Sequence, residues 1–180
     1  MTRYWVGIAN RDHVSKAVEG CFCQVMRGKE APLRQIDRDD LFLFYSPRER
    51  TRSAEPLMAF TAIGRVIDDR PYHAVQSETF RPFRRKVAYF EAQEAEIHPL
   101  LGRLSFARSR RSWGHVLRRG FFEIDEGDYG VVAEAMAVRS ERCPGPVTGR
   151  LSPGDAVPSK KVLPRSRCPQ DKLAGGAYEE

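Results

Sequence analysis

Residues 41–46 read Leu-Phe-Leu-Phe-Tyr-Ser and are followed directly by Pro47. The run is apolar without alternation, which is typical of a strand buried on both faces. A polar loop over 48–56 separates it from a second apolar stretch at 57–66. The two stretches therefore predict two long strands joined by a charged loop.

Shorter elements extend outward from these two strands. Residues 3–9, 83–90 and 120–124 are rich in aromatic and β-branched residues and predict further strands. Apolar residues recur at helical spacing over 14–21, 97–104 and 129–136, which predicts three helices. Proline at position 99 falls in the first turn of the second helix, where it is tolerated.

The order of these elements decides the fold class. Five or more strands with small helices between them do not alternate as βαβ units. The pattern predicts a mixed α+β domain, a small closed or nearly closed β-barrel of about five to six strands flanked by short helices.

The composition changes after residue 138. Residues 139–180 contain six prolines and five glycines in 42 residues and show no helical or strand period. Such a segment buries too little apolar surface to offset its ordering entropy. The sequence predicts a domain over 1–138 and a disordered, basic tail over 139–180.

The basic residues are concentrated in one stretch. The chain of 180 residues carries a formal charge of +6, and residues 81–119 alone hold ten Lys and Arg against three Asp and Glu. Phosphate contacts dominate the affinity of proteins for nucleic acid. A polyanion such as nucleic acid is therefore the expected partner.

Several other classes of protein are excluded by the pattern. No apolar run approaches the roughly 20 residues of a membrane span, and no secretory signal precedes the first strand, so we expect a cytoplasmic protein without a membrane partner. The chain has no P-loop, hydrolase elbow or dinucleotide fingerprint. Cys21 and Cys23 stand closer than the cysteine pairs of zinc sites. We expect no cofactor and no metal.

Five segments resemble the EVE-domain family of the PUA/ASCH-like superfamily, which is related to YTH-type readers. The segments follow the family's order over essentially 1–138. They are YWVGIANRDHV at 4–14, GCFCQV at 20–25, FYSP at 44–47, AFTAIGRV at 59–66 with FRPFRR at 80–85, and WG at 113–114 with RRGFFEI at 118–124.

The resemblance implies a PUA-like barrel flanked by helices, with a pocket at one side. We interpret the protein as a binding domain rather than an enzyme. Related readers hold a modified base in an aromatic cage, so we expect recognition of a base such as 5-methylcytosine in DNA or RNA. A fitted pocket recovers the stacking that an extruded base loses, about a few kcal/mol.

Six residues are candidates for the pocket. Phe22 follows the first helix, where the similar YTH readers carry a cage tryptophan, and Trp5 and Trp113 are further aromatic candidates; a place in the core is the alternative for Phe22 and Trp5. Tyr45 and Ser46 end a strand, where their hydroxyls could meet a base edge. Asn10 has a second interpretation as a helix cap.

Four arginines are candidates for phosphate contacts: Arg84, Arg85, Arg118 and Arg119. Adjacent residues of a strand point to opposite faces, so at most one arginine of each pair is expected to face the pocket. Solvated surface charge is the alternative for each.

Two other functions stay open. ASCH-like relatives include small amidohydrolases that act on modified nucleosides through a Thr-Lys-Glu set, for which this chain offers Thr61, Lys16 and Glu123 without a matching motif around them. A protein-interaction module is the other alternative, and its affinity would be insensitive to salt.

Overall fold

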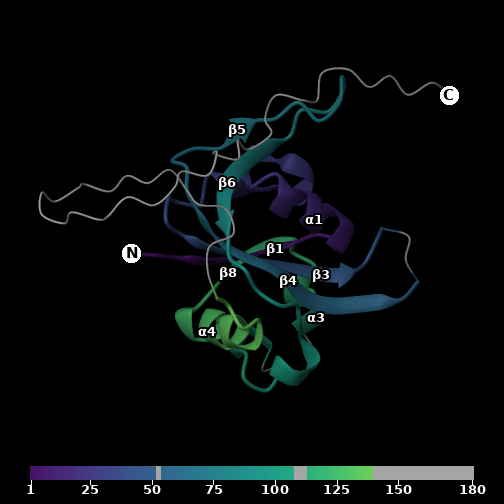
Figure 1. Cartoon of the computed structure of the whole chain (residues 1–180), viewed down its shortest axis with the longest axis vertical. Helices are drawn as coiled ribbons and strands as arrows, with labels where there is room; N and C mark the ends of the chain where they lie inside the picture. The colour runs from purple at the N-terminus through teal and green to yellow at the C-terminus, as the bar shows by residue number, and fades with distance from the viewer. Residues whose placement is uncertain (52–53, 108–112, 140–180) are drawn as a thin grey trace, which may run out of the picture. The chain divides into compact units, whose positions relative to one another are not determined.

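A curled, mixed β-sheet organises the domain. The computed structural model describes residues 1–51, 54–107 and 113–139. The strands are β1 (Tyr4–Ile8), β2 (Phe22–Cys23), β3 (Leu41–Arg48), β4 (Pro56–Val66), β5 (Tyr72–His73), β6 (Phe83–Tyr89), β7 (Ala95–Glu96) and β8 (Phe121–Ile124). The main order is β2-β6-β4-β3-β1-β8, with β5 on β6 and β7 on β4 (Figure 1).

The long strands β3 and β4 form an antiparallel pair in the middle of this order. Strand β1 runs parallel to β3, and β8 runs antiparallel to β1. The β3–β4 register shifts twice, between Phe44 and Tyr45 and between Ser46 and Arg48. Such irregularities bend a strand and increase its twist. They accompany the curling of the sheet into a half-barrel, and the predicted α+β class is confirmed.

Strand β3 is buried on both faces, as its unbroken apolar run predicts. Phe42 and Phe44 join one core cluster, while Leu43 and Tyr45 join the other. The alternation follows from the period of two in a strand. One cluster includes residues of α1 and α2, and the other includes residues of α3 and α4.

The helices are short. They are α1 (Arg11–Glu19), α2 (Glu30–Leu33), α3 (Trp113–Leu117) and α4 (Glu126–Ala135), with 3-10 turns η1 (Met26–Gly28), η2 (His98–Leu100) and η3 (Ser105–Ala107). The N-terminus of α4 is capped by Asp125, whose side chain accepts a hydrogen bond of 2.7 Å from the Asp128 amide. This satisfies one of the free donors of the first helical turn.

The predicted helix over 97–104 is wrong. The segment forms η2 and a turn, and η3 follows directly after it. Most of its amides bond three residues back, as from Leu100 to the Ile97 carbonyl at 2.9 Å, and the Leu104 amide bonds four residues back to Leu100 at 3.1 Å. Ile97, Leu100 and Leu104 are nevertheless buried. Successive 3-10 turns therefore bury the same apolar residues that suggested a helix, because spacings of three suit both structures.

The predicted tail, apart from Arg139, lies outside the described residues. In the part of the chain that the structure describes, no helix has the length and apolar character needed to cross a bilayer.

Candidate nucleic-acid interface

A cavity of about 540 Å³ opens where four segments of the chain meet. The segments are the end of β1 with the first turns of α1, the η1 region, the β3–β4 loop and the β5–β6 loop. The lining residues are mostly polar: Ile8, Ala9, Asn10, Asp12, His13, Lys16, Gln24, Met26, Arg27, Thr51, Gln76 and Phe80. The volume falls within the ~300–1,000 Å³ typical of small-molecule sites.

Asn10 connects two walls of the cavity. It stands at the N-cap position of α1, but its side chain makes no capping hydrogen bond. Its Nδ2 instead donates to the hydroxyl of Thr51 at 3.0 Å. The Asn10 amide therefore ties the start of α1 to the β3–β4 loop.

Arg11 holds the same loop from outside the cavity. Its guanidinium donates to Glu49 at 3.1 Å and to Glu94 at 2.7 Å. The backbone amide of Asp12 also donates to the Glu49 carbonyl, at 3.1 Å. Partly exposed ion pairs contribute little stability, typically about 0–1 kcal/mol each. Their effect here is to place Thr51 against the cavity.

Arg84 lies behind the cavity on top of Phe22. The guanidinium carbon is 3.8 Å from the centre of the Phe22 ring, a cation–π contact. Arg84 donates to the side-chain oxygens of Gln24 at 2.9 Å and of Gln76 at 3.0 Å. Burial lowers the pKa of this guanidinium from its ordinary value of 12.5. Arg84 thus links two amides of the cavity wall to an aromatic ring beneath them.

His13 brings a neutral imidazole to the cavity. Burial, and secondly the positive charge of Arg84, lower the pKa of His13 from its ordinary value of 6.5. A neutral imidazole donates one hydrogen bond and accepts another. The cavity therefore offers an uncharged imidazole near neutral pH.

The η1 turn forms a strained wall. Met26, Arg27 and Gly28 all have positive φ, at 46°, 58° and 75°. Non-glycine residues in this region cost of order 1–3 kcal/mol each and occur often at functional sites. A Cβ at Gly28 would overlap Pro82, so the turn lies directly against the β5–β6 segment.

The family model described as "EVE domain" matches residues 3–135. The chain belongs to the EVE-domain family.

Relatives of this EVE domain span most of its length. It is similar to the UPF0310 protein in the gntR 5′ region of Bacillus licheniformis, 41% identical over 71% of this chain and 86% of the relative. It is 42% identical to a UPF0310 protein of Mycobacterium avium over 73% and 96% of the two chains. Among solved structures, a hypothetical protein from Leishmania major aligns at a TM-score of 0.47 and 12% identity, over 74% of this chain and 94% of that one.

Of the pocket candidates in the EVE domain, Asn10 lines the cavity and Phe22 lies behind it under Arg84. Trp5 is buried in the core, where its Nε1 donates to Asp40 at 2.9 Å and its ring stacks on Phe121 at 4.9 Å. The core alternative therefore describes the packing of Trp5 and Phe22.

The remaining pocket candidates lie away from the cavity lining. Tyr45 is buried against Phe60, and burial raises the pKa of its phenol to about 12. Ser46 is fully buried and shares a hydrogen bond of 2.7 Å with Thr61. Trp113 begins α3, half-buried against the core, with its ring 6.0 Å from that of His98.

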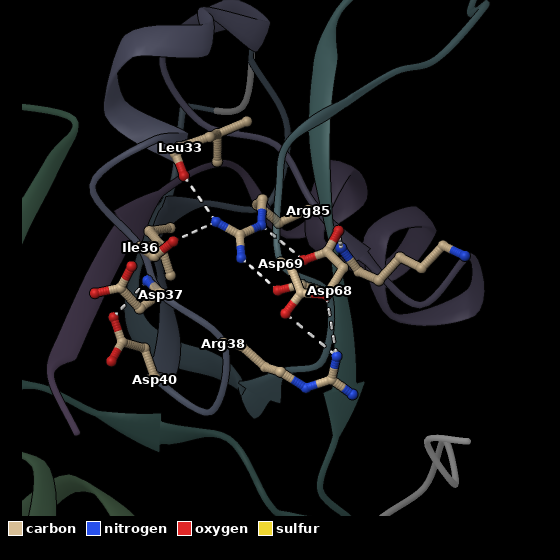
Figure 2. A network of polar contacts seen from close by, with 9 residues as sticks. Leu33, Ile36, Asp37, Arg38, Asp40, Asp68, Asp69 and Arg85 are labelled. Carbon is tan, nitrogen blue, oxygen red and sulfur yellow. Dashed lines mark hydrogen bonds and ion pairs between the residues drawn. The ribbon is translucent and has the colours of Figure 1, made fainter. Parts of the chain in front are cut away.

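Arg85 has a structural role. It is fully buried and donates to the Asp68 carboxylate at 2.6 Å, to the Asp68 carbonyl at 2.6 Å and to the carbonyls of Leu33 and Ile36 (Figure 2). Figure 2 shows the guanidinium enclosed between these partners. All three nitrogens of its guanidinium are engaged in this way.

Arg118 and Arg119 are exposed in the turn between α3 and β8 rather than on a strand. The next residue, Gly120, accepts a hydrogen bond of 3.0 Å from the Ile8 amide, and a Cβ on it would lie 3.6 Å from the Met26 side chain. Ile8 and Met26 both line the cavity. The two arginines therefore belong to the segment that borders its rim.

The residues considered for hydrolysis are not assembled around the cavity. Lys16 lines it, but Thr61 is bonded to Ser46 and Glu123 forms a bidentate pair with Arg3 at 2.8 and 2.7 Å. Neither Thr61 nor Glu123 is among the residues that line the cavity.

Sequence reasoning missed seven polar or aromatic lining residues: Asp12, His13, Gln24, Arg27, Thr51, Gln76 and Phe80. They come from separate segments, and no spacing along the chain connects them. The one signal available was a phenylalanine between Thr79 and Arg81 in a polar loop, where an apolar ring is unusual.

Proposed function

We propose that this EVE domain binds nucleic acid, holds one modified base in the cavity and does not transform it chemically. The observation that carries the proposal is the cavity itself, which combines hydrogen-bonding side chains of both kinds with cations at its wall. Lys16 and Arg27 line it and Arg84 adjoins it, against one lining carboxylate, that of Asp12. Membership of the EVE-domain family supports the proposal.

The polar wall suits the edge of a base. The amides of Asn10, Gln24 and Gln76, the hydroxyl of Thr51 and the neutral imidazole of His13 provide both donors and acceptors. Unstacked bases are recognised by such bonds along their edges. Arginine guanidinium groups also stack on bases, and Arg84 is held 3.8 Å above the centre of the Phe22 ring.

The cations suit the sugar-phosphate backbone. Lys16 and Arg27 lie at the cavity, and Arg118 and Arg119 border its rim through Gly120. Contacts of this kind place a strand without reading its sequence. The base contacts and the phosphate contacts thus come from different side chains, which lets mutation separate them.

Fluorescence anisotropy with labelled oligonucleotides tests the proposal. A strand with 5-methylcytosine should bind about fourfold more tightly than one with cytosine, because burial of a methyl group contributes about 0.8 kcal/mol. Asn10→Ala should reduce this preference. Lys16→Gln should weaken both strands alike and reduce the slope of affinity against salt by about one.

Arg103→Gln is the matched control, since Arg103 is paired with Glu134 and does not line the cavity. It should leave both affinities unchanged. Equal binding of modified and unmodified strands across a panel of modifications would contradict the recognition of a modified base. Affinity that does not respond to salt would remove nucleic acid as the partner. Turnover of an acylated nucleoside would favour the amidohydrolase instead.

A further inference from the structure

Exposed apolar side chains are gathered at the mouth of the cavity. Within the described residues, the exposed large apolar side chains are Met1, Met26, Val75, Phe80 and Val138. Met1 and Val138 lie at the ends of the described part of the domain. Met26 and Phe80 line the cavity, and Val75 directly precedes Gln76, which also lines it. Exposed apolar side chains that cluster in this way indicate a surface that contacts a partner.

Phe80 is held in place although 38% of its surface is exposed. It stands in the loop that connects β5 to β6, and this loop extends beyond the sheet at the top of Figure 1. The Phe80 carbonyl accepts from the Gln76 amide at 3.1 Å, and the Phe80 amide donates to the Ser77 hydroxyl at 3.1 Å. These bonds order the loop before any ligand arrives, which lowers the entropy lost on binding.

Met26 approaches the mouth from a second segment that contacts the first. The η1 turn lies against the β5–β6 segment at Gly28 and Pro82. The side chain of Gln76 is also tied to β6, through its bond to Arg84. The two apolar side chains therefore stand on connected supports rather than on independent loops.

Cations surround this apolar group. Arg81 is exposed next to Phe80, Arg27 lies next to Met26, and Arg118 and Arg119 border the rim near Met26. Proteins that open a duplex combine these two features: phosphate-binding cations and an apolar side chain that enters the base stack. A protein that only held a free nucleoside would need neither the exposed ring nor the outer arginines.

We propose that Phe80, supported by Met26 on the second segment of the cavity lining, is a wedge that enters the stack of a duplex while the neighbouring base occupies the cavity. The preferred substrate of the domain is therefore double-stranded nucleic acid from which the base is extruded. This inference rests on the proposed function. The wedge replaces stacking lost by the remaining bases, and the cavity replaces that lost by the extruded base.

Three substrates of one sequence test the wedge: a single strand with 5-methylcytosine, the fully paired duplex, and a duplex in which that base is mismatched. Phe80→Ala should weaken binding of the paired duplex by tenfold or more. It should change single-strand binding by less than twofold and give an intermediate loss for the mismatched duplex, whose base is already easier to extrude. Phe80→Leu should restore most of the lost affinity.

Val138→Ala is the matched control, an exposed apolar residue that does not line the cavity, and it should change none of the three affinities. A similar loss on all three substrates for Phe80→Ala would overturn the wedge and leave base binding intact, with Phe80 as a mere wall of the cavity. Failure of the unmutated protein to bind any of the three would overturn the proposed function and the wedge together.

Discussion

Arg84 and Arg85 are neighbours on β6 with the same side chain, yet their surroundings differ in kind. Arg85 is enclosed by the Asp68 carboxylate and by backbone carbonyls. Within the described residues, Arg84 bonds instead to two amide oxygens, makes a cation–π contact with Phe22 and adjoins the cavity. An arginine whose nitrogens all have internal partners stabilises the fold, whereas one placed on a ring beside a cavity can serve a ligand. A count of basic residues does not distinguish the two.

The largest effect is expected from Arg85→Met. Removing one partner of a buried ion pair leaves the other without compensation, and such changes cost about 3–5 kcal/mol. Urea unfolding should show this loss. The control, Arg38→Met, removes a pair with Asp69 that is partly exposed and should cost less than about 1 kcal/mol. Equal losses in the two variants would break the distinction between a buried structural arginine and a surface one.

Gly28→Ala should follow in size, because it acts on the support of the cavity. A Cβ at φ +75° is strained by about 1–2 kcal/mol, and here it would also overlap Pro82. We expect a loss of about 2 kcal/mol in urea unfolding together with weaker oligonucleotide binding. Gly102→Ala is the control, since nothing lies near its Cβ position. Unchanged binding by a folded Gly28→Ala protein would show that the η1 turn does not shape the site.

Arg84→Gln sharpens the comparison directly. We expect oligonucleotide affinity to fall about tenfold, equivalent to about 1.4 kcal/mol, through loss of the charge and of the cation–π contact with Phe22. The stability of the fold should change less than in Arg85→Met. Anisotropy titration and urea unfolding of the same samples check both statements. A loss of stability with unchanged affinity in Arg84→Gln would show that Arg84, like Arg85, has a structural role.

The smallest effect concerns His13 and pH. The folded protein lowers the pKa of His13 below 6.5, chiefly by burial, so the unfolded chain takes up this proton first as pH falls. The contribution of the neutral imidazole to the free energy of unfolding is therefore complete above pH 6.5 and decreases as pH falls through that value. Urea midpoints at pH 7.5 and 5.5 should differ less for His13→Gln than for the unmutated protein. An identical pH response would contradict a depressed pKa.

The sheet was largely predictable from the sequence, because its long strands have patterns that burial enforces. The unbroken run at 41–46 predicts a strand covered on both sides, and β3 is one. Strands of two residues, such as β2 and β5, carry no period and were not predicted. The helix predicted over 97–104 was wrong for a different reason: an apolar spacing of three to four residues does not distinguish 3-10 turns from an α-helix.

The cavity was hardly predictable, because it depends on contacts between segments far apart in the chain. Asn10, for example, lines the cavity next to Thr51, to which its side chain is hydrogen-bonded and which lies 41 residues further along the chain. The aromatic residues gave a misleading signal, since Trp5 and Tyr45 are large rings that the core requires. Polar residues such as Gln24 and Gln76 carry no signature of their own, and only the fold brings both to the cavity and to Arg84.

The positions of the two tryptophans determine what intrinsic emission can report. Trp5 is sealed against Phe121 and Trp113 packs beside His98, and neither lines the cavity. Their fluorescence should change strongly when the fold is lost, and iodide should quench Trp113 in preference to Trp5. An oligonucleotide titration followed by tryptophan emission alone would be nearly silent even at saturation, so a label on the strand is needed to observe occupancy.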